Sequence, residues 1–313
     1  PRDAHPYVAL LDELSFQADL RFCDYVQYQQ DGPFLVRLER WLSNSHDTGQ
    51  RQAQLRLLEH LVFIDELQMT ALYRDAFRRI ISPWLTGGGT DISDLLATDY
   101  ADRQRDLLAD YQIASISESF DVGLLLKASD LHGIPRPVIL GPNRERALAT
   151  YRTLNPDTAG CIVCEDIVGT GKQAGKILRA IEDVAPAHWR LLFVPLIAFE
   201  DGILNLRERY RVRTEVRPVI TLPRAQCLKK EPQPAEPEVF KAVRGIIKNT
   251  AARVTERADR FDDPPSNPFG YEGTGGLIVT CHNAPNNTLP LIHHKAPSWD
   301  PLFRRLHHKE RAS

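Results

Sequence analysis

The chain has 313 residues and a mass of 35.5 kDa, enough for about two domains and for a core that needs no disulfide bonds or structural metal. Its 39 basic and 41 acidic residues give a formal net charge of −2. This balance excludes a globally basic nucleic-acid binder, although a local basic patch stays open. No apolar stretch approaches the roughly 18 residues of a membrane-spanning helix, so we expect no membrane association.

The cysteines and the start of the chain bear on location. Five cysteines are few and odd in number, which does not fit the disulfide framework of a secreted protein. The chain opens on Pro1, has Met69 as its only methionine and shows no charged and then apolar leader. We therefore expect a trimmed start, no signal peptide and a cytoplasmic location.

The first third of the chain predicts helices. Apolar residues recur at helical spacing over residues 7–30 and, more strongly, over residues 52–81. Pro83 and a run of three glycines end this block, and a further helix is expected over residues 92–111. The pattern predicts a helical N-terminal domain over residues 1–110, which is also a candidate surface for assembly into an oligomer.

The remainder, residues 111–313, has a different pattern, because short β-like runs alternate with helical stretches. We expect strands at residues 138–140, 161–164, 191–197 and 216–222, and helices at residues 144–154, 172–184 and 201–210. Such alternation is typical of a parallel sheet with helices on its faces. The second domain is therefore predicted to be α/β.

The most informative segment runs from Cys161 to Gln173 and reads CIVCEDIVGTGKQ. Its apolar strand leads into Glu165 and Asp166, which we expect at the carboxyl edge of the sheet, where open α/β folds bind ligands. The turn that follows exposes backbone N–H groups at a helix N-terminus, which suits one phosphate group. Two carboxylates beside a phosphate suit a ribose diol, or a Mg²⁺ ion that carries further phosphates.

Two other interpretations apply to this segment. A nucleotide P-loop fails, because Asp166 stands where that motif needs a glycine and Gln173 stands where it needs Ser or Thr. The second interpretation, an ordinary strand, turn and helix with a charged tip, is compatible with the sequence. The acids, the glycines and Thr170 nevertheless all fall in the register that phosphate binding requires.

The arrangement resembles the phosphoribosyl-pyrophosphate (PRPP) motif of type I phosphoribosyltransferases, in which an apolar strand, two acids and a Thr-Gly loop follow one another. The resemblance implies that Glu165 and Asp166 orient the ribose hydroxyls, act in catalysis and hold Mg²⁺. It also implies that the loop binds the 5-phosphate. The loop residues are Val168, Gly169, Thr170, Gly171, Lys172 and Gln173. Lys172 and Gln173 depart from the family pattern, which has a small residue and a hydroxyl residue there.

A second segment narrows the resemblance. Residues 267–290 read NPFGYEGTGGLIVTCHNAPNNTLP, and WDPLF follows at residues 299–303. With the acidic loop, these segments are similar to a phosphoribosyltransferase-like family of bacterial conflict systems, whose members occur beside retron reverse transcriptases and other defence genes. The resemblance covers nearly the whole chain and implies a phosphoribosyltransferase-like (Rossmann-like) fold with PRPP as co-substrate.

Polar residues after the last apolar run are further candidates. His282 is the candidate general base, and Asn283, Asn286 and Asn287 are candidates for binding substrate, because such side chains hydrogen-bond a base, a sugar or an acceptor. An Asn/Pro turn that satisfies its own backbone explains the same residues equally well. Cys281 lacks a third group that would orient it as a nucleophile, so a buried thiol is expected.

An earlier strand is followed by Gly141, Asn143 and Arg144. In a phosphoribosyltransferase fold, the loop after an earlier strand holds pyrophosphate, and an arginine suits two-pronged contact with phosphate. A helix start with a surface arginine is the alternative.

The sequence therefore predicts an α/β enzyme that uses PRPP and Mg²⁺ and acts as an effector of bacterial antiphage defence. It does not identify the acceptor substrate. One alternative is a non-catalytic module that senses a nucleotide or PRPP, or that docks to a reverse transcriptase and its RNA or DNA. Another is a hydrolase of PRPP or of a nucleotide. Gln173 favours the sensor, and the presence of both acids opposes it.

Overall fold

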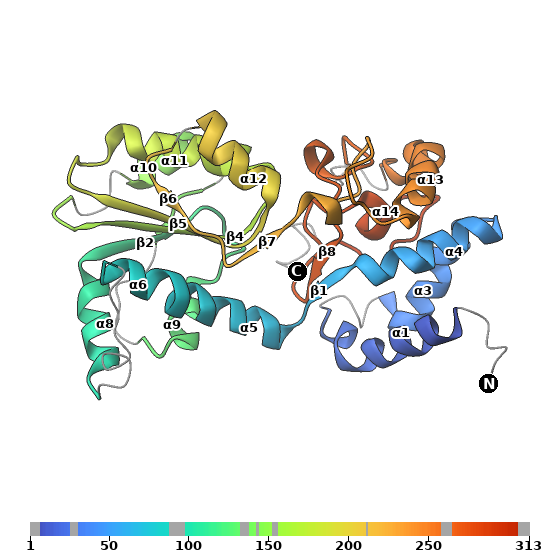
Figure 1. The fold of residues 1–313 in the computed structure, drawn as a ribbon, viewed down its shortest axis with the longest axis horizontal. Helices are drawn as coiled ribbons and strands as arrows, with labels where there is room; N and C mark the ends of the chain where they lie inside the picture. The colour runs from blue at the N-terminus through green and yellow to red at the C-terminus, as the bar shows by residue number, and fades with distance from the viewer. Residues whose placement is uncertain are drawn as a thin grey trace. The chain divides into compact units, whose positions relative to one another are not determined.

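The computed structural model describes residues 7–25, 31–87, 98–131, 138–141, 144–151, 156–210, 212–257 and 265–305 (Figure 1). The chain divides into two compact units. Unit 1 combines residues 1–66 with residues 224–313, and unit 2 is the continuous segment 67–223. This division differs from the predicted boundary between residues 110 and 111.

Unit 2 contains the predicted parallel sheet. Its strands are β2 (Tyr111–Ser115), β3 (Val138–Ile139), β4 (Gly160–Val168), β5 (Arg190–Phe199), β6 (Glu215–Val216) and β7 (Ile220–Leu222). They lie in the order β3-β2-β4-β5-β6, with β7 also paired to β5, and every pairing is parallel. Ser115 pairs with Ile139 on one side and with Cys164 on the other, so β2 and β3 end at the same level and β4 continues past them to Val168.

Helices cover both faces of this sheet, as Figure 1 shows. One face carries α10 (Arg144–Tyr151), α11 (Lys172–Val184), α12 (Glu200–Asn205) and η4 (Leu206–Tyr210). The other carries α5 (Glu66–Asp75), η3 (Ala76–Ile81), α6 (Ser82–Leu85), α8 (Tyr100–Ala109) and α9 (Val122–Ala128). The central strands β4 and β5 are mostly apolar because both of their faces are buried. The exceptions are Glu165 and Asp166 in β4 and Arg190 at the start of β5.

The helices α5, η3, α6 and α8 precede residue 110 but belong to unit 2, because they pack on its sheet. The ring of Trp84 meets the ring of Tyr111 at 5.2 Å, and the Arg190 guanidinium stacks over Trp84 at 4.1 Å. Arg190 also donates to the Trp84 carbonyl oxygen at 2.6 Å. These contacts join α6 to the start of β5, although the sequence pattern predicts α6 as part of the N-terminal domain.

Unit 1 is mostly helical. It contains α1 (Val8–Leu20), η1 (Phe22–Asp24), α3 (Phe34–Ser43), α4 (Thr48–Leu57), η2 (Leu58–His60), η5 (Arg224–Gln226), α13 (Val239–Val254), η6 (Tyr271–Gly273) and α14 (Pro290–His293). Two short parallel strands, β1 (Val62–Ile64) and β8 (Ile278–Thr280), join its two chain segments. β1 interrupts the stretch 52–81 that was predicted as helical, because its apolar residues pair with β8.

The core of unit 1 is aromatic. The indole nitrogens of Trp41 and Trp299 both donate to the Leu291 carbonyl oxygen, at 2.7 and 3.0 Å. Phe34 and Phe303 pack nearby with ring centroids 5.8 Å apart. Side chains from both ends of the chain therefore form one core. Across the described residues, we find no helix with both the length and the apolar character needed to cross a bilayer.

Candidate functional site

The acid pair lies where β4 approaches its end. β4 continues through Glu165 and Asp166 to Val168, four residues beyond the predicted strand. Glu165 is buried and receives two hydrogen bonds from Ser117: the backbone N–H donates to Oε2 at 3.0 Å, and the hydroxyl donates to Oε1 at 2.6 Å. Asp166 is half-buried and accepts the N–H of Ile167 at 2.7 Å. The two acids therefore differ in environment, and Asp166 is the more accessible one.

Burial is the largest influence on the pKa of the Glu165 carboxyl and raises it well above its ordinary value. The neighbouring Asp166 carboxyl raises this pKa further, and the bonds from Ser117 oppose the shift. Burial therefore favours the protonated form of Glu165, and the two donors of Ser117 favour its carboxylate form.

This pKa shift makes the stability of the chain depend on pH. Above the ordinary carboxyl value of 4.5, the unfolded chain has lost a proton that folded Glu165 still holds, so stability falls as pH rises through the raised pKa. Glu165→Gln cannot titrate and is expected to gain stability relative to the wild type over that interval. Urea unfolding of both proteins across a pH series checks this. A stability difference that is constant with pH would show an ordinary pKa.

The turn after β4 forms the predicted helix start. Gly171 adopts φ +73° and caps α11, which begins at Lys172. A Cβ atom at Gly171 would lie 2.5 Å from the Gly202 carbonyl oxygen, and one at Gly202 would lie 2.3 Å from the Gly169 carbonyl oxygen. The Asn205 amide also donates to the Thr170 carbonyl oxygen at 2.9 Å. The loop is therefore held against α12 through backbone contacts that only glycine permits.

The loop between β2 and α9, residues 116–121, borders the acid pair. The Ser117 and Ser119 hydroxyls lie 2.5 Å apart. At the far end, the Asp121 N–H donates to the Tyr73 hydroxyl at 2.9 Å, and the Asp121 carboxylate accepts the Leu124 N–H to cap α9. Residues 118 and 119 form a turn and are exposed. The loop therefore meets the acid pair through Ser117.

The geometry can be compared with known proteins. The PRTase-CE family model matches residues 38–305 of the chain. The chain belongs to the PRTase-CE family. The match spans the acid pair, the turn before α11 and residues 267–290, and it is consistent with the phosphoribosyltransferase-like fold of unit 2. Searches of curated proteins and of solved structures gave no match.

Other predicted residues of this PRTase-CE chain fall at the same sheet edge. Gly141 follows β3 with φ +89°, and the Leu140 N–H before it donates to the Ser115 carbonyl oxygen at 2.8 Å. Arg144 opens α10. Asn143 lies outside the described residues, as does the side chain of Arg144.

The predicted residues after β8 belong to unit 1, whereas the acid pair belongs to unit 2. His282 and Asn286 are exposed. The Asn283 side-chain oxygen Oδ1 accepts the Ala284 N–H at 3.0 Å, and the Asn287 side-chain amide donates to the Thr274 hydroxyl at 3.1 Å. These bonds favour the interpretation of Asn283 and Asn287 as residues that stabilise a turn.

The cysteines of this PRTase-CE chain are poor candidates for chemistry. Cys281 is 2% exposed, and burial raises the pKa of its thiol to about 12, so the reactive thiolate does not form at neutral pH. Cys161 and Cys164 are buried as well. Within the described ranges, no three His, Cys, Asp or Glu side chains group in a way that would hold a metal ion by themselves.

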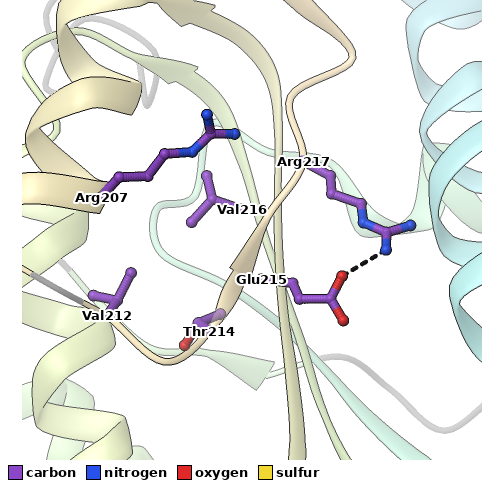
Figure 2. Close-up of a pocket in the computed structure, with 6 residues that line it drawn as sticks. All are labelled: Arg207, Val212, Thr214, Glu215, Val216 and Arg217. Atoms are coloured by element: carbon purple, nitrogen blue, oxygen red, sulfur yellow. Dashed lines mark hydrogen bonds and ion pairs between the residues drawn. The ribbon is translucent and has the colours of Figure 1, made fainter.

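A shallow pocket of about 300 Å³ lies beside β6, and Figure 2 shows its lining. Arg207 extends toward Val216, while Glu215 is bound by Arg217 at 2.5 Å and by the Trp84 indole nitrogen at 2.9 Å. The pocket contains neither the acid pair nor the glycine turn. We therefore place the candidate site at the carboxyl ends of β2, β3 and β4.

Proposed function

We propose that the chain is a phosphoribosyltransferase-type enzyme that uses PRPP and Mg²⁺. The proposal rests on one strand–turn–helix of a PRTase-CE chain. It carries two carboxylates on β4, a glycine turn held against α12 and the N-terminus of α11. We also propose a role in bacterial antiphage defence, for which the support is the resemblance to families of conflict systems.

The residues fit a Mg²⁺ ion that arrives with its ligand. Mg²⁺ sites commonly use one or two carboxylates together with substrate phosphates and waters, so a full set of protein ligands is not required. Asp166 would be the first ligand, because it is the more accessible acid, and Glu165 would lie behind it. When bound, the ion would neutralise charge on the departing pyrophosphate.

The protein groups have separate roles in the proposed reaction. The N–H groups of the turn at residues 169–173 would hold the 5-phosphate at the N-terminus of α11. Asp166 and Glu165 would orient the ribose hydroxyls and stabilise the positive charge that develops at the anomeric carbon as its bond to pyrophosphate breaks. His282 remains the candidate base for the acceptor, and the acceptor itself stays open.

A second candidate function is a non-catalytic sensor of PRPP or a nucleotide. Gln173 favours it, because this exposed amide lies in the first turn of α11 where the motif has a hydroxyl residue. A sensor would pass the bound state on to a partner, for which we propose a reverse transcriptase with its RNA or DNA.

Calorimetric titration with PRPP and Mg²⁺ tests the proposal. We expect binding to the wild type, loss of binding in Asp166→Asn, and no change in Asp102→Asn, an exposed charge on α8 that pairs with Arg105. A pyrophosphate-release assay on the same samples then separates an enzyme from a sensor. Absence of binding at millimolar PRPP would overturn the proposal.

A further inference from the structure

The β2–α9 loop and the acid pair are connected by one residue. Ser117 directs two donors at one carboxylate, its N–H to Oε2 and its hydroxyl to Oε1 of Glu165. Two donors on two oxygen atoms fix the plane of a carboxylate as well as its position. Because the Ser117 hydroxyl proton goes to Glu165, the Ser119 hydroxyl is the donor in the contact between the two serines.

The other end of the loop is held independently. The Tyr73 hydroxyl accepts the Asp121 N–H at 2.9 Å, and the Tyr73 ring packs on the buried ring of Phe120 with centroids 5.0 Å apart. The loop is therefore fixed to α5 at residues 120–121. Its N-terminal half is attached to β4 in two places. The Ile116 N–H donates to the Cys164 carbonyl oxygen at 3.1 Å, and Ser117 donates to the carboxylate of Glu165.

We propose that Ser117 is a positioning residue, which holds the Glu165 carboxylate in one orientation and joins the β2–α9 loop to the acid pair as one rigid body. This inference deepens the proposed function and rests on it for its consequence in PRPP binding. The consequence is that the acid pair and the β2–α9 loop are prearranged for one ligand, which reduces the ordering cost of binding.

Ligand-free hydrogen exchange tests the attachment itself. In Ser117→Ala, which loses the hydroxyl donor, we expect faster amide exchange at residues 116 and 117, whose N–H groups donate to the Cys164 carbonyl oxygen and to Glu165 Oε2. Ser117→Thr keeps both donors and is expected to restore slow exchange. The control is Ser115→Ala, because the buried Ser115 hydroxyl has no hydrogen-bond partner among the residues that the structure describes. Equal exchange in all four proteins, the wild type included, would overturn the proposal.

PRPP titration tests the consequence. Ser117→Ala is expected to weaken PRPP–Mg²⁺ binding about ten- to hundredfold, the usual effect of losing a hydrogen bond to a charged group, and Ser117→Thr to recover most of the affinity. If the wild type fails to bind PRPP while the exchange pattern holds, the proposed function is wrong and the positioning role stands. If PRPP binds equally to wild type and Ser117→Ala, the positioning role is wrong and the proposed function stands.

Discussion

Gly171→Ala is expected to abolish PRPP binding and to lower the free energy of unfolding by about 1–3 kcal/mol. Gly171 adopts φ +73°, which costs an L-residue energy, and an added Cβ would lie 2.5 Å from the Gly202 carbonyl oxygen. The turn and α12 would have to separate to relieve this contact. The N–H groups that are proposed to hold the 5-phosphate would then lose their arrangement, so binding is lost together with stability.

Gly245→Ala is the matched control for this substitution. Gly245 lies within α13, where an added Cβ would meet nothing within 4 Å. Alanine there is expected to leave stability unchanged or to raise it by about 0.5–1 kcal/mol, since glycine is a poor helix former. Denaturant unfolding and PRPP titration measure both variants. If Gly171→Ala kept full stability and affinity, the glycine requirement at the turn would be wrong.

The second large effect is expected in unit 1. Trp41→Ala should lower the free energy of unfolding by about 3–5 kcal/mol, the usual range for removing a buried aromatic side chain. Trp41 is fully buried, and its indole nitrogen donates to the Leu291 carbonyl oxygen at 2.7 Å. The substitution leaves a cavity between α3 and α14 and removes one donor from that oxygen.

Phe16→Ala is the control for Trp41→Ala within the same unit. Phe16 lies on α1 and is 62% exposed, so its removal is expected to change stability by less than about 0.5 kcal/mol. Guanidinium unfolding followed by circular dichroism compares the two. A loss in Trp41→Ala no larger than that in Phe16→Ala would contradict the role of Trp41 in the core.

Local sequence pattern predicted much of unit 2. The alternation of apolar runs and helical stretches gave the parallel sheet, and the strand–turn–helix at residues 161–184 was confirmed with Gly171 at the helix start. β1 was missed because a three-residue strand acquires its identity from β8, which lies far along the chain. The domain boundary was placed differently for a similar reason, since the packing of Trp84 on the sheet leaves no local signal.

The candidate site, too, was predictable from the sequence only in part. The position of Glu165 and Asp166 at the strand end followed from their place after an apolar run. The contact between Ser117 and Glu165 depends on the register of β2 against β4, which composition does not encode. The available signal is the serine-rich stretch after residue 114, which leads to Asp121. Asp121 caps α9 at the other end of the loop.

The pairing of β1 with β8 has a consequence for synthesis on the ribosome. Residues 62–64 are made long before residues 278–280, so β1 has no partner strand while the middle of the chain emerges. Unit 2 is continuous and has all of its strands once residue 223 has been made. Because contacts distant in sequence form late, we expect unit 2 to fold first and unit 1 to close last. Until then, the face of α4 that packs on α13 in the folded unit is without that partner helix.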